Sequence, residues 1–246
     1  MIRLVSLGWM LLAGSLLLAR PICAEPLILG FENREQWENW QEISFPGRAG
    51  THYEFDPAAE MVCALAIASA SALAHEFPGQ LADYPVLSWE WRIEHVLEKG
   101  DARSRQGDDY AGRVYVNFKR DQRLSRWERA RARILEVFYG REIPGRTLNF
   151  IWANRLEIDE IVTSTYTANA RLVALQSGNQ RAGTWVREEV NIAEYYRRAF
   201  GGEPPPIHSL ALMTDSDNTG ETVRSCYRNI KLATGSTVPP APGSRP

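Results

Sequence analysis

Residues Val86–Ile93 read Val-Leu-Ser-Trp-Glu-Trp-Arg-Ile, which is the most regular pattern in the sequence. From Leu87 onward every second residue is large and apolar, and the residues between them are serine, glutamate and arginine. Successive side chains of a β-strand point to opposite faces, so this spacing predicts a strand with one buried face. Trp89 and Trp91 are therefore expected in the core.

Similar short runs of alternating or apolar residues occur on both sides of this stretch. They are Leu27–Phe31, Thr51–Phe55, Met61–Ser69, Arg113–Phe118, Leu148–Ala153, Arg171–Gln176, Thr184–Val190, Ile207–Thr214 and Ser225–Leu232. Turn-forming residues separate them, and helices do not alternate regularly with them. Many short strands in this arrangement predict an all-β domain, an antiparallel β-sandwich or jelly roll, over residues 25–234.

Two segments have helical spacing instead. Leu124–Tyr139 is amphipathic with an arginine-rich face, and we expect it to be an inserted helix packed against a sheet edge, with attachment to a membrane surface as the alternative. Ile192–Phe200 is preceded by Asn191, which has Glu194 three residues later, and is followed by Gly201. These are start and stop signals for a short helix.

The first 24 residues have the pattern of a secretory signal peptide. Arg3 precedes the apolar run Leu4–Ala19, and Ala24 is a small residue suited to cleavage. The run is shorter than the roughly 20 residues that span a bilayer. We therefore expect cleavage after Ala24, a periplasmic or secreted protein, and no transmembrane segment in the remaining chain. Residues 235–246 are rich in Pro, Gly and Ser, which predicts a disordered tail.

Cleavage changes the charge and the cysteine count. The leader holds two of the 28 basic residues and none of the 30 acidic ones, so the remaining chain has a formal charge of −4. This balance argues against nucleic acid as a partner. Cys63 and Cys226 remain, each expected on a core-facing strand face, Cys63 with Leu65 and Cys226 with Ile230. An even pair permits one disulfide, but two separate buried thiols are the simpler interpretation.

An acidic loop, Gly107–Arg113, leads into one of the predicted strands. It contains Asp108, Asp109 and Tyr110. Adjacent carboxylates repel each other, so such a loop usually offers them a cation, an arginine or water. Arg113 is close enough to be that partner. The alternative is a charged turn in which an aspartate caps its own backbone.

A second acidic loop, Thr214–Gly220, follows the Ile207 strand. Asp215, Asp217 and Asn218 supply oxygen atoms before a glycine, as in the first half of a calcium loop. The pattern then fails, because the position where a bidentate glutamate belongs is Cys226. The alternatives are a structural calcium ion at Asp215 and Asp217 and a tight turn stabilised by its own side chains. If both acidic loops meet, their oxygens suit a hard cation or a row of sugar hydroxyls.

The order and spacing of several motifs resemble those of a bacterial family known as domain of unknown function 3047. The motifs are Gly107–Arg113, Asn149–Ala153, Ser177–Gly178 followed by Trp185, and Thr214–Gly220. The resemblance implies a secreted β-sandwich similar to galactose-binding-like domains and carbohydrate-binding modules. It supplies no activity, so no catalytic residue is carried over from it.

Motifs of common catalytic sites are sparse in this sequence: a Gly-x-Ser-x-Gly elbow, a phosphate-binding glycine loop and a His-Glu-x-x-His helix are all missing. We therefore favour a secreted non-catalytic binding module for a glycan or other polar envelope component. The alternatives are a structural protein that binds another envelope protein, and a polysaccharide hydrolase or lyase with paired aspartates as acid and base. The candidate ligand-binding residues are Asp108, Asp109, Tyr110, Arg113, Trp152, Asp215, Asp217 and Asn218.

Overall fold

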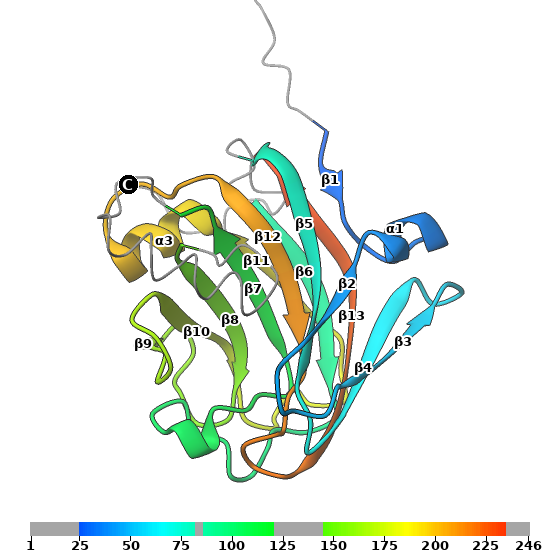
Figure 1. The fold of residues 1–246 in the computed structure, drawn as a ribbon, viewed down its shortest axis with the longest axis vertical. Coiled ribbons are helices and arrows are strands. Elements are labelled where there is room, and N and C mark those ends of the chain that lie inside the picture. The colour runs from blue at the N-terminus through cyan, green and yellow to red at the C-terminus, as the bar shows by residue number, and fades with distance from the viewer. Residues whose placement is uncertain (1–24, 82–85, 121–144, 235–246) are drawn as a thin grey trace, which may run out of the picture.

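The computed structural model describes residues 25–81, 86–120 and 145–234 (Figure 1). The expected signal peptide, the helix expected at Leu124–Tyr139 and the expected tail at 235–246 lie outside the described residues.

The described strands form two sheets that pack face to face (Figure 1). The first sheet contains Val186–Asn191 (β11), Val86–Ile93 (β6), Thr222–Ala233 (β13), Met61–Ile67 (β4) and His52–Asp56 (β3) in that order, with Leu27–Ile28 (β1) also paired to β13. The second sheet contains Gln41–Ser44 (β2), Ser71–Leu81 (β5), Ile207–Met213 (β12), Arg113–Phe118 (β7), Thr147–Ala153 (β8), Ala170–Ser177 (β10) and Ile161–Thr163 (β9) in that order. The predicted β-sandwich is confirmed.

One pairing departs from the expected antiparallel arrangement. β10 runs parallel to β8, with Leu172 beside Asn149. The short strand β9 lies between them in sequence and pairs antiparallel with the far edge of β10. The chain therefore reverses direction twice between β8 and β10, which makes these two neighbours parallel.

The core lies between the sheets and is rich in aromatic residues. The four alternating apolar side chains of β6, Leu87, Trp89, Trp91 and Ile93, are at most 1% exposed, as their alternation predicts. Trp91 packs against Trp152 of the opposite sheet, with ring centroids 5.7 Å apart. Because each large aromatic ring removes much apolar area from water, these contacts hold the two sheets together.

A β-bulge in β13 changes which residues face the core. Asn229 has a φ of 55°, and the register with β6 shifts between Arg228 and Lys231. As a result Tyr227 and Ile230 both point into the core although they are three positions apart. A bulge adds one residue to one strand and so reverses the alternation beyond it. The expectation that Cys226 shares a face with Ile230 is therefore wrong.

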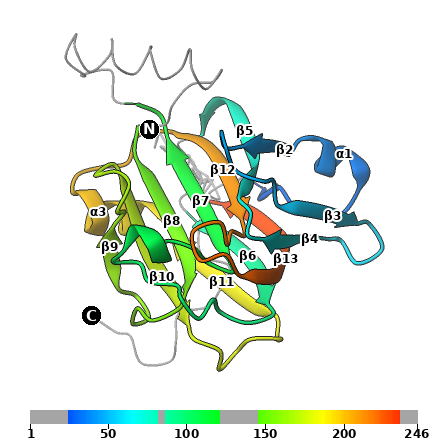
Figure 2. The same cartoon turned by 60° about the horizontal axis from the view of Figure 1, so that its bottom comes forward.

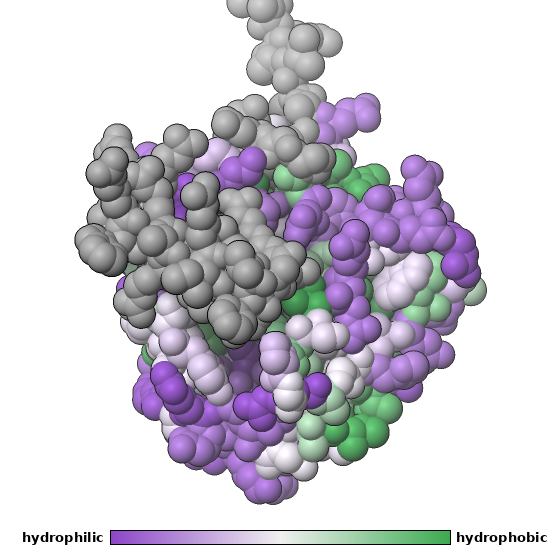
Figure 3. Space-filling view, in the orientation of Figure 1, coloured by the Kyte–Doolittle hydropathy of each residue, from purple (hydrophilic) through white to green (hydrophobic). Residues whose placement is uncertain are grey.

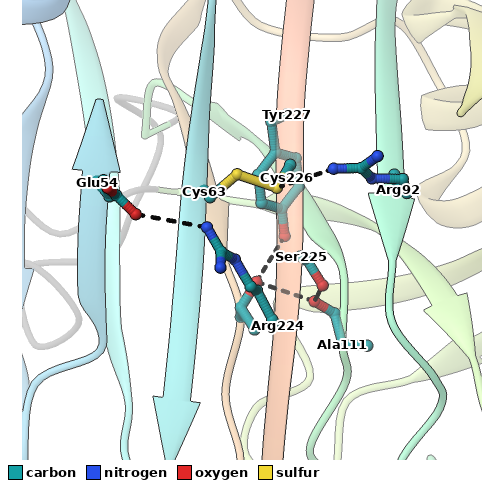
Figure 4. The surroundings of a disulfide bond; sticks show 9 residues. Glu54, Cys63, Arg92, Ala111, Arg224, Ser225, Cys226 and Tyr227 are labelled. Carbon is teal, nitrogen blue, oxygen red and sulfur yellow. Dashed lines mark hydrogen bonds and ion pairs between the residues drawn. A yellow bond between two sulfur atoms is a disulfide. The ribbon is translucent and has the colours of Figure 1, made fainter. Parts of the chain in front are cut away.

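Both cysteines lie on the outer face of the first sheet. Cys63 is flanked by Val62 and Ala64, which are the core residues of β4, so its own side chain points the other way. Cys63 and Cys226 are partners in the register of β4 and β13, and they form a disulfide bond (Figure 4). This bond replaces the two separate thiols that the sequence favours. The side chains are nevertheless buried, with Cys63 4% and Cys226 3% exposed.

Within the described residues, three short helical segments join the strands: Arg34–Glu38 (α1), Arg105–Gly107 (η1) and Ile192–Phe200 (α3). α3 has the predicted bounds, and the Asn191 side chain accepts a hydrogen bond from Glu194 N at 3.0 Å. Across the three described ranges, no helix combines the length and the apolar character needed to cross a bilayer.

Candidate functional site

A groove of about 400 Å³ lies on the outer face of the second sheet. Its floor includes Tyr115 and Asn117 of β7 and Asn149 of β8. These residues alternate with core residues along their strands, so their side chains point away from the opposite sheet. Figure 3 views the molecule from this side and shows hydrophilic residues interspersed with hydrophobic ones where the surface is coloured.

The two acidic loops meet at one end of this groove. The loop before β7 and the loop between β12 and β13 lie at the same end of the sandwich (Figure 2). Tyr110 N donates to Asp215 Oδ1 at 3.2 Å. In the other direction, Asn218 N and Thr219 N donate to Asp109 Oδ2 at 2.9 and 2.6 Å. Each loop therefore supplies donors to a carboxylate of the other.

Arg113, the first residue of β7, stands at the centre of this junction. Its Nε and Nη2 each donate to one oxygen of Asp215 at 2.8 Å, and Nη2 also reaches Asp108 Oδ1 at 3.2 Å. The Arg113 guanidinium lies 4.3 Å from the centre of the Tyr110 ring. The Arg113 and Asp215 side chains are only 6% and 3% exposed, so the pair is shielded from solvent. A forked, buried pair of this kind fixes the geometry of both loops.

Burial shifts the pKa values of the junction. It raises the pKa of the Asp215 carboxyl well above its ordinary value, and the Arg113 charge opposes that shift. It also raises the pKa of Asp109, against the stabilising hydrogen bonds from Thr219. For Arg113, burial acts to lower the pKa, but Asp215, Tyr115 and Asp108 together keep it well above the usual value.

Five of the eight predicted residues line the groove: Asp108, Arg113, Asp215, Asp217 and Asn218. Asp217 Oδ2 lies 3.0 Å from Arg48 Nε. Asn218 Nδ2 donates to the Tyr166 hydroxyl at 2.6 Å and also to the carbonyl of Arg105. Asp109 and Tyr110 belong to the same junction but are at most 1% exposed and do not line the groove.

Trp152 lies elsewhere, and its assignment as a ligand-binding residue is corrected. Its side chain is fully buried between the sheets, and its Nε1 donates to Gly178 O at 2.9 Å. Trp152 occupies a core position of β8, where Asn149 and Ile151 point outward. It therefore presents no surface to a ligand.

Residues 38–231 match the model of a family described as Protein of unknown function (DUF3047). The chain belongs to this family. The match covers the strands that form the groove and both acidic loops, and it confirms the resemblance seen in the motifs. No curated protein matches the chain.

The DUF3047 chain is similar to a number of solved structures at low sequence identity, and two of them illustrate the similarity. One is the family 11 carbohydrate-binding module of a cellulosomal cellulase of Clostridium thermocellum, with 12% identity, a TM-score of 0.40, and coverage of 85% of this chain and 94% of that one. The other is endoglucanase 3 of Trichoderma harzianum, from family GH12, with 9% identity, a TM-score of 0.39, and coverage of 86% and 95%. Similarity at this level does not indicate what the DUF3047 chain binds.

The groove contains residues that the sequence motifs do not single out. Tyr115 and Asn117 share the outward face of β7 with Arg113, so the alternation of that strand was a usable signal. Arg48 and Tyr166 come from loops distant in sequence, and no local pattern marks them. Their place in the groove follows only from the pairing of the strands that carry these loops.

Proposed function

We propose that this DUF3047 chain is a non-catalytic binding module that holds a glycan or another polar ligand in the groove on the outer face of the second sheet. The observation that carries the proposal is the floor of the groove. Asn149 is 3% exposed, lines the groove, and has an Oδ1 atom without a hydrogen-bond donor. A buried acceptor without a donor is costly. A ligand hydroxyl would supply the missing donor when the Asn149 side chain turns its enclosed Oδ1 toward the groove that it lines.

Neighbouring polar groups on the floor are already fixed. Asn117 Oδ1 accepts from Thr147 Oγ1 at 2.9 Å, and its Nδ2 donates to Ser209 Oγ at 3.1 Å. The Tyr115 hydroxyl accepts from Arg113 Nη1 at 3.0 Å. Polar groups held in place before binding lose little conformational freedom when a ligand arrives. They therefore favour a polar ligand with several hydroxyl groups.

Tyr166 supplies an aromatic surface at the same groove. It is 52% exposed, and its hydroxyl is held by Asn218 Nδ2 at 2.6 Å. The Arg105 guanidinium lies 5.2 Å from the centre of its ring. An exposed ring that is fixed in position suits contact with the apolar face of a sugar.

The aspartates at the groove favour binding over hydrolysis. Glycoside hydrolysis generally needs one carboxyl group to donate a proton and a second to act as nucleophile or base. Asp108 and Asp215 share the Arg113 guanidinium, and Asp217 is paired with Arg48. Carboxylates held this way are stabilisers of the loops, so we place the paired-aspartate hydrolase or lyase below the binding module.

The proposal includes export to the periplasm or the medium. Expression of the complete gene in a Gram-negative host, followed by N-terminal sequencing of the exported protein, is expected to give Glu25 as first residue. A protein that keeps Met1 and stays in the cytoplasm would contradict the proposed location.

A glycan array tests the proposed ligand class. The wild-type chain is expected to bind a subset of soluble oligosaccharides, and Tyr166→Ala is expected to lose that signal. Lys231→Ala is the matched control, because Lys231 lies on the first sheet and lines a separate surface hollow. Absence of binding to every glycan, with capture of one envelope protein instead, would favour the structural-protein alternative over this proposal.

A further inference from the structure

Three carboxylates from the two acidic loops converge beside the groove. Asp109, Asp215 and Asp217 each bring an oxygen to within 4.8 Å of the other two. Calcium binds carboxylate oxygens at about 2.3–2.6 Å, so two ligands of one ion lie at most about 5 Å apart. The three carboxylates are therefore close enough to hold one calcium ion. Magnesium, with bonds of about 2.0–2.1 Å, requires a tighter arrangement.

Asp109 gives an independent reason to place a cation there. Its side chain is fully buried, and Oδ2 takes both backbone donors, from Asn218 and Thr219. The other oxygen, Oδ1, is buried without a hydrogen-bond partner. A buried carboxylate with an unpartnered oxygen costs much free energy while it is charged, and a bound cation would remove that cost.

The charges in direct contact at this junction do not cancel. Four carboxylates meet there, those of Asp108, Asp109, Asp215 and Asp217, and the guanidinium groups that pair with them belong to Arg113 and Arg48. With all four carboxylates ionised, as a bound cation would keep them, four negative and two positive groups leave a formal charge of −2. Lys99 and Glu221 lie next to the loop. Lys99 Nζ donates to Thr219 O, and the Glu221 carboxylate accepts from the backbone amides of residues 98 and 99. The charges of Lys99 and Glu221 offset each other.

The bonds from Arg113 leave room for a metal. They occupy one acceptor position on each oxygen of Asp215, and Tyr110 N takes a second on Oδ1. A carboxylate has about four such positions, so Oδ2 retains one.

We infer that a calcium ion binds between Asp109, Asp215 and Asp217 and joins the two acidic loops at the end of the groove. This site extends the calcium pair expected at Asp215 and Asp217 by adding Asp109 from the other loop. It is independent of glycan binding, because its ligands are the protein's own side chains.

Calorimetry and thermal unfolding of the full chain test the site. Protein freed of metal with a chelator is titrated with calcium chloride and, separately, with magnesium chloride. Calcium is expected to bind with a stoichiometry of one and to raise the melting temperature by about 5 to 10 °C at a hundredfold excess over the dissociation constant. Asp217→Asn is expected to weaken calcium binding at least tenfold, and Asp109→Asn likewise.

Asp159→Asn is the matched control, since Asp159 also pairs with an arginine, Arg198, at 2.7 Å but lies outside the cluster. It is expected to bind calcium as the wild type does. Absence of heat and of any melting shift at about 10 mM calcium, binding of magnesium alone, or unchanged binding by Asp217→Asn would each overturn the inference. If Asp109→Asn fails to fold, Asp217→Asn decides alone, because its side chain is less buried. No sugar is present, so a negative result leaves the test of the groove unaffected.

Discussion

Arg113 donates to both carboxylate oxygens of Asp215, each over 2.8 Å, although the two residues are 102 positions apart in the sequence. Arg113 begins β7, and Asp215 follows the neighbouring strand β12. The pairing of these two strands thus brings the acidic loops together, and the ion pair fixes their relative position at the end of the groove.

Removal of the Arg113 charge is expected to destabilise the protein strongly. Arg113→Met leaves Asp215 and Asp108 buried without their cation, and loss of one partner of a buried pair costs about 3–5 kcal/mol. Urea unfolding at neutral pH measures the effect. Arg103→Met is the control, because Arg103 pairs with Glu160 at 2.6 Å but is 58% exposed, and such a pair contributes about 1 kcal/mol or less. Equal losses in the two variants would contradict the central role of Arg113.

The disulfide is expected to stabilise the first sheet. It links β4 to β13 and closes a sequence separation of 163 residues. Replacing both cysteines by serine is expected to lower the free energy of unfolding by about 2–5 kcal/mol. A reducing agent should destabilise the wild type and leave the double variant unchanged. Alkylation of both thiols in unfolded, non-reduced protein would show that the bond is missing.

Glu188 is expected to make stability depend on pH. It lies on β11, where its Oε1 accepts from Trp91 Nε1 at 3.1 Å and from Gln176 Nε2 of the opposite sheet at 2.7 Å. Burial raises the pKa of Glu188 to about 7 from an ordinary 4.5, against these hydrogen bonds and the Arg181 charge. The folded state thus prefers the protonated form. This contribution to stability is complete below pH 4.5 and is lost as the pH rises through 7.

The variant Glu188→Gln keeps the acceptor and removes the charge. Its advantage over the wild type is expected to be small near pH 4.5 and to grow to about 3 kcal/mol at pH 8. Urea unfolding of both proteins across this range measures the difference. A difference that stays constant with pH would show that Glu188 does not titrate in the folded protein.

Local patterns predict the strands and miss what depends on distant partners. The alternation of Val86–Ile93 correctly gives a strand with buried tryptophans, and the Asn191 cap correctly starts α3. A single residue, Asn229, changes the alternation of β13 and moves Cys226 to the outer face. A bulge has no strong sequence signal, because it depends on the register with the neighbouring strand.

The sequence predicts the candidate site only in part, because the site also depends on which strands are neighbours. The acidic loops are visible as clusters of aspartates, and Arg113 is close in sequence to one of them. That the loops meet depends on the pairing of β7 with β12. Trp152 was misplaced because its strand is apolar on both faces, with Ile151 and Trp152 equally buried, so alternation could not tell the core face from the groove face.

The affinity of groove variants for the ligand found on the array tests the central claim most directly. Isothermal titration with the wild type, Asn149→Ala and Lys231→Ala gives three dissociation constants under one set of conditions. We predict that Asn149→Ala weakens binding about 5- to 30-fold, the loss expected for one hydrogen bond of about 1–2 kcal/mol, and that Lys231→Ala leaves it unchanged. Equal affinity of Asn149→Ala and the wild type, or a loss in Lys231→Ala instead, would contradict the placement of the ligand in this groove.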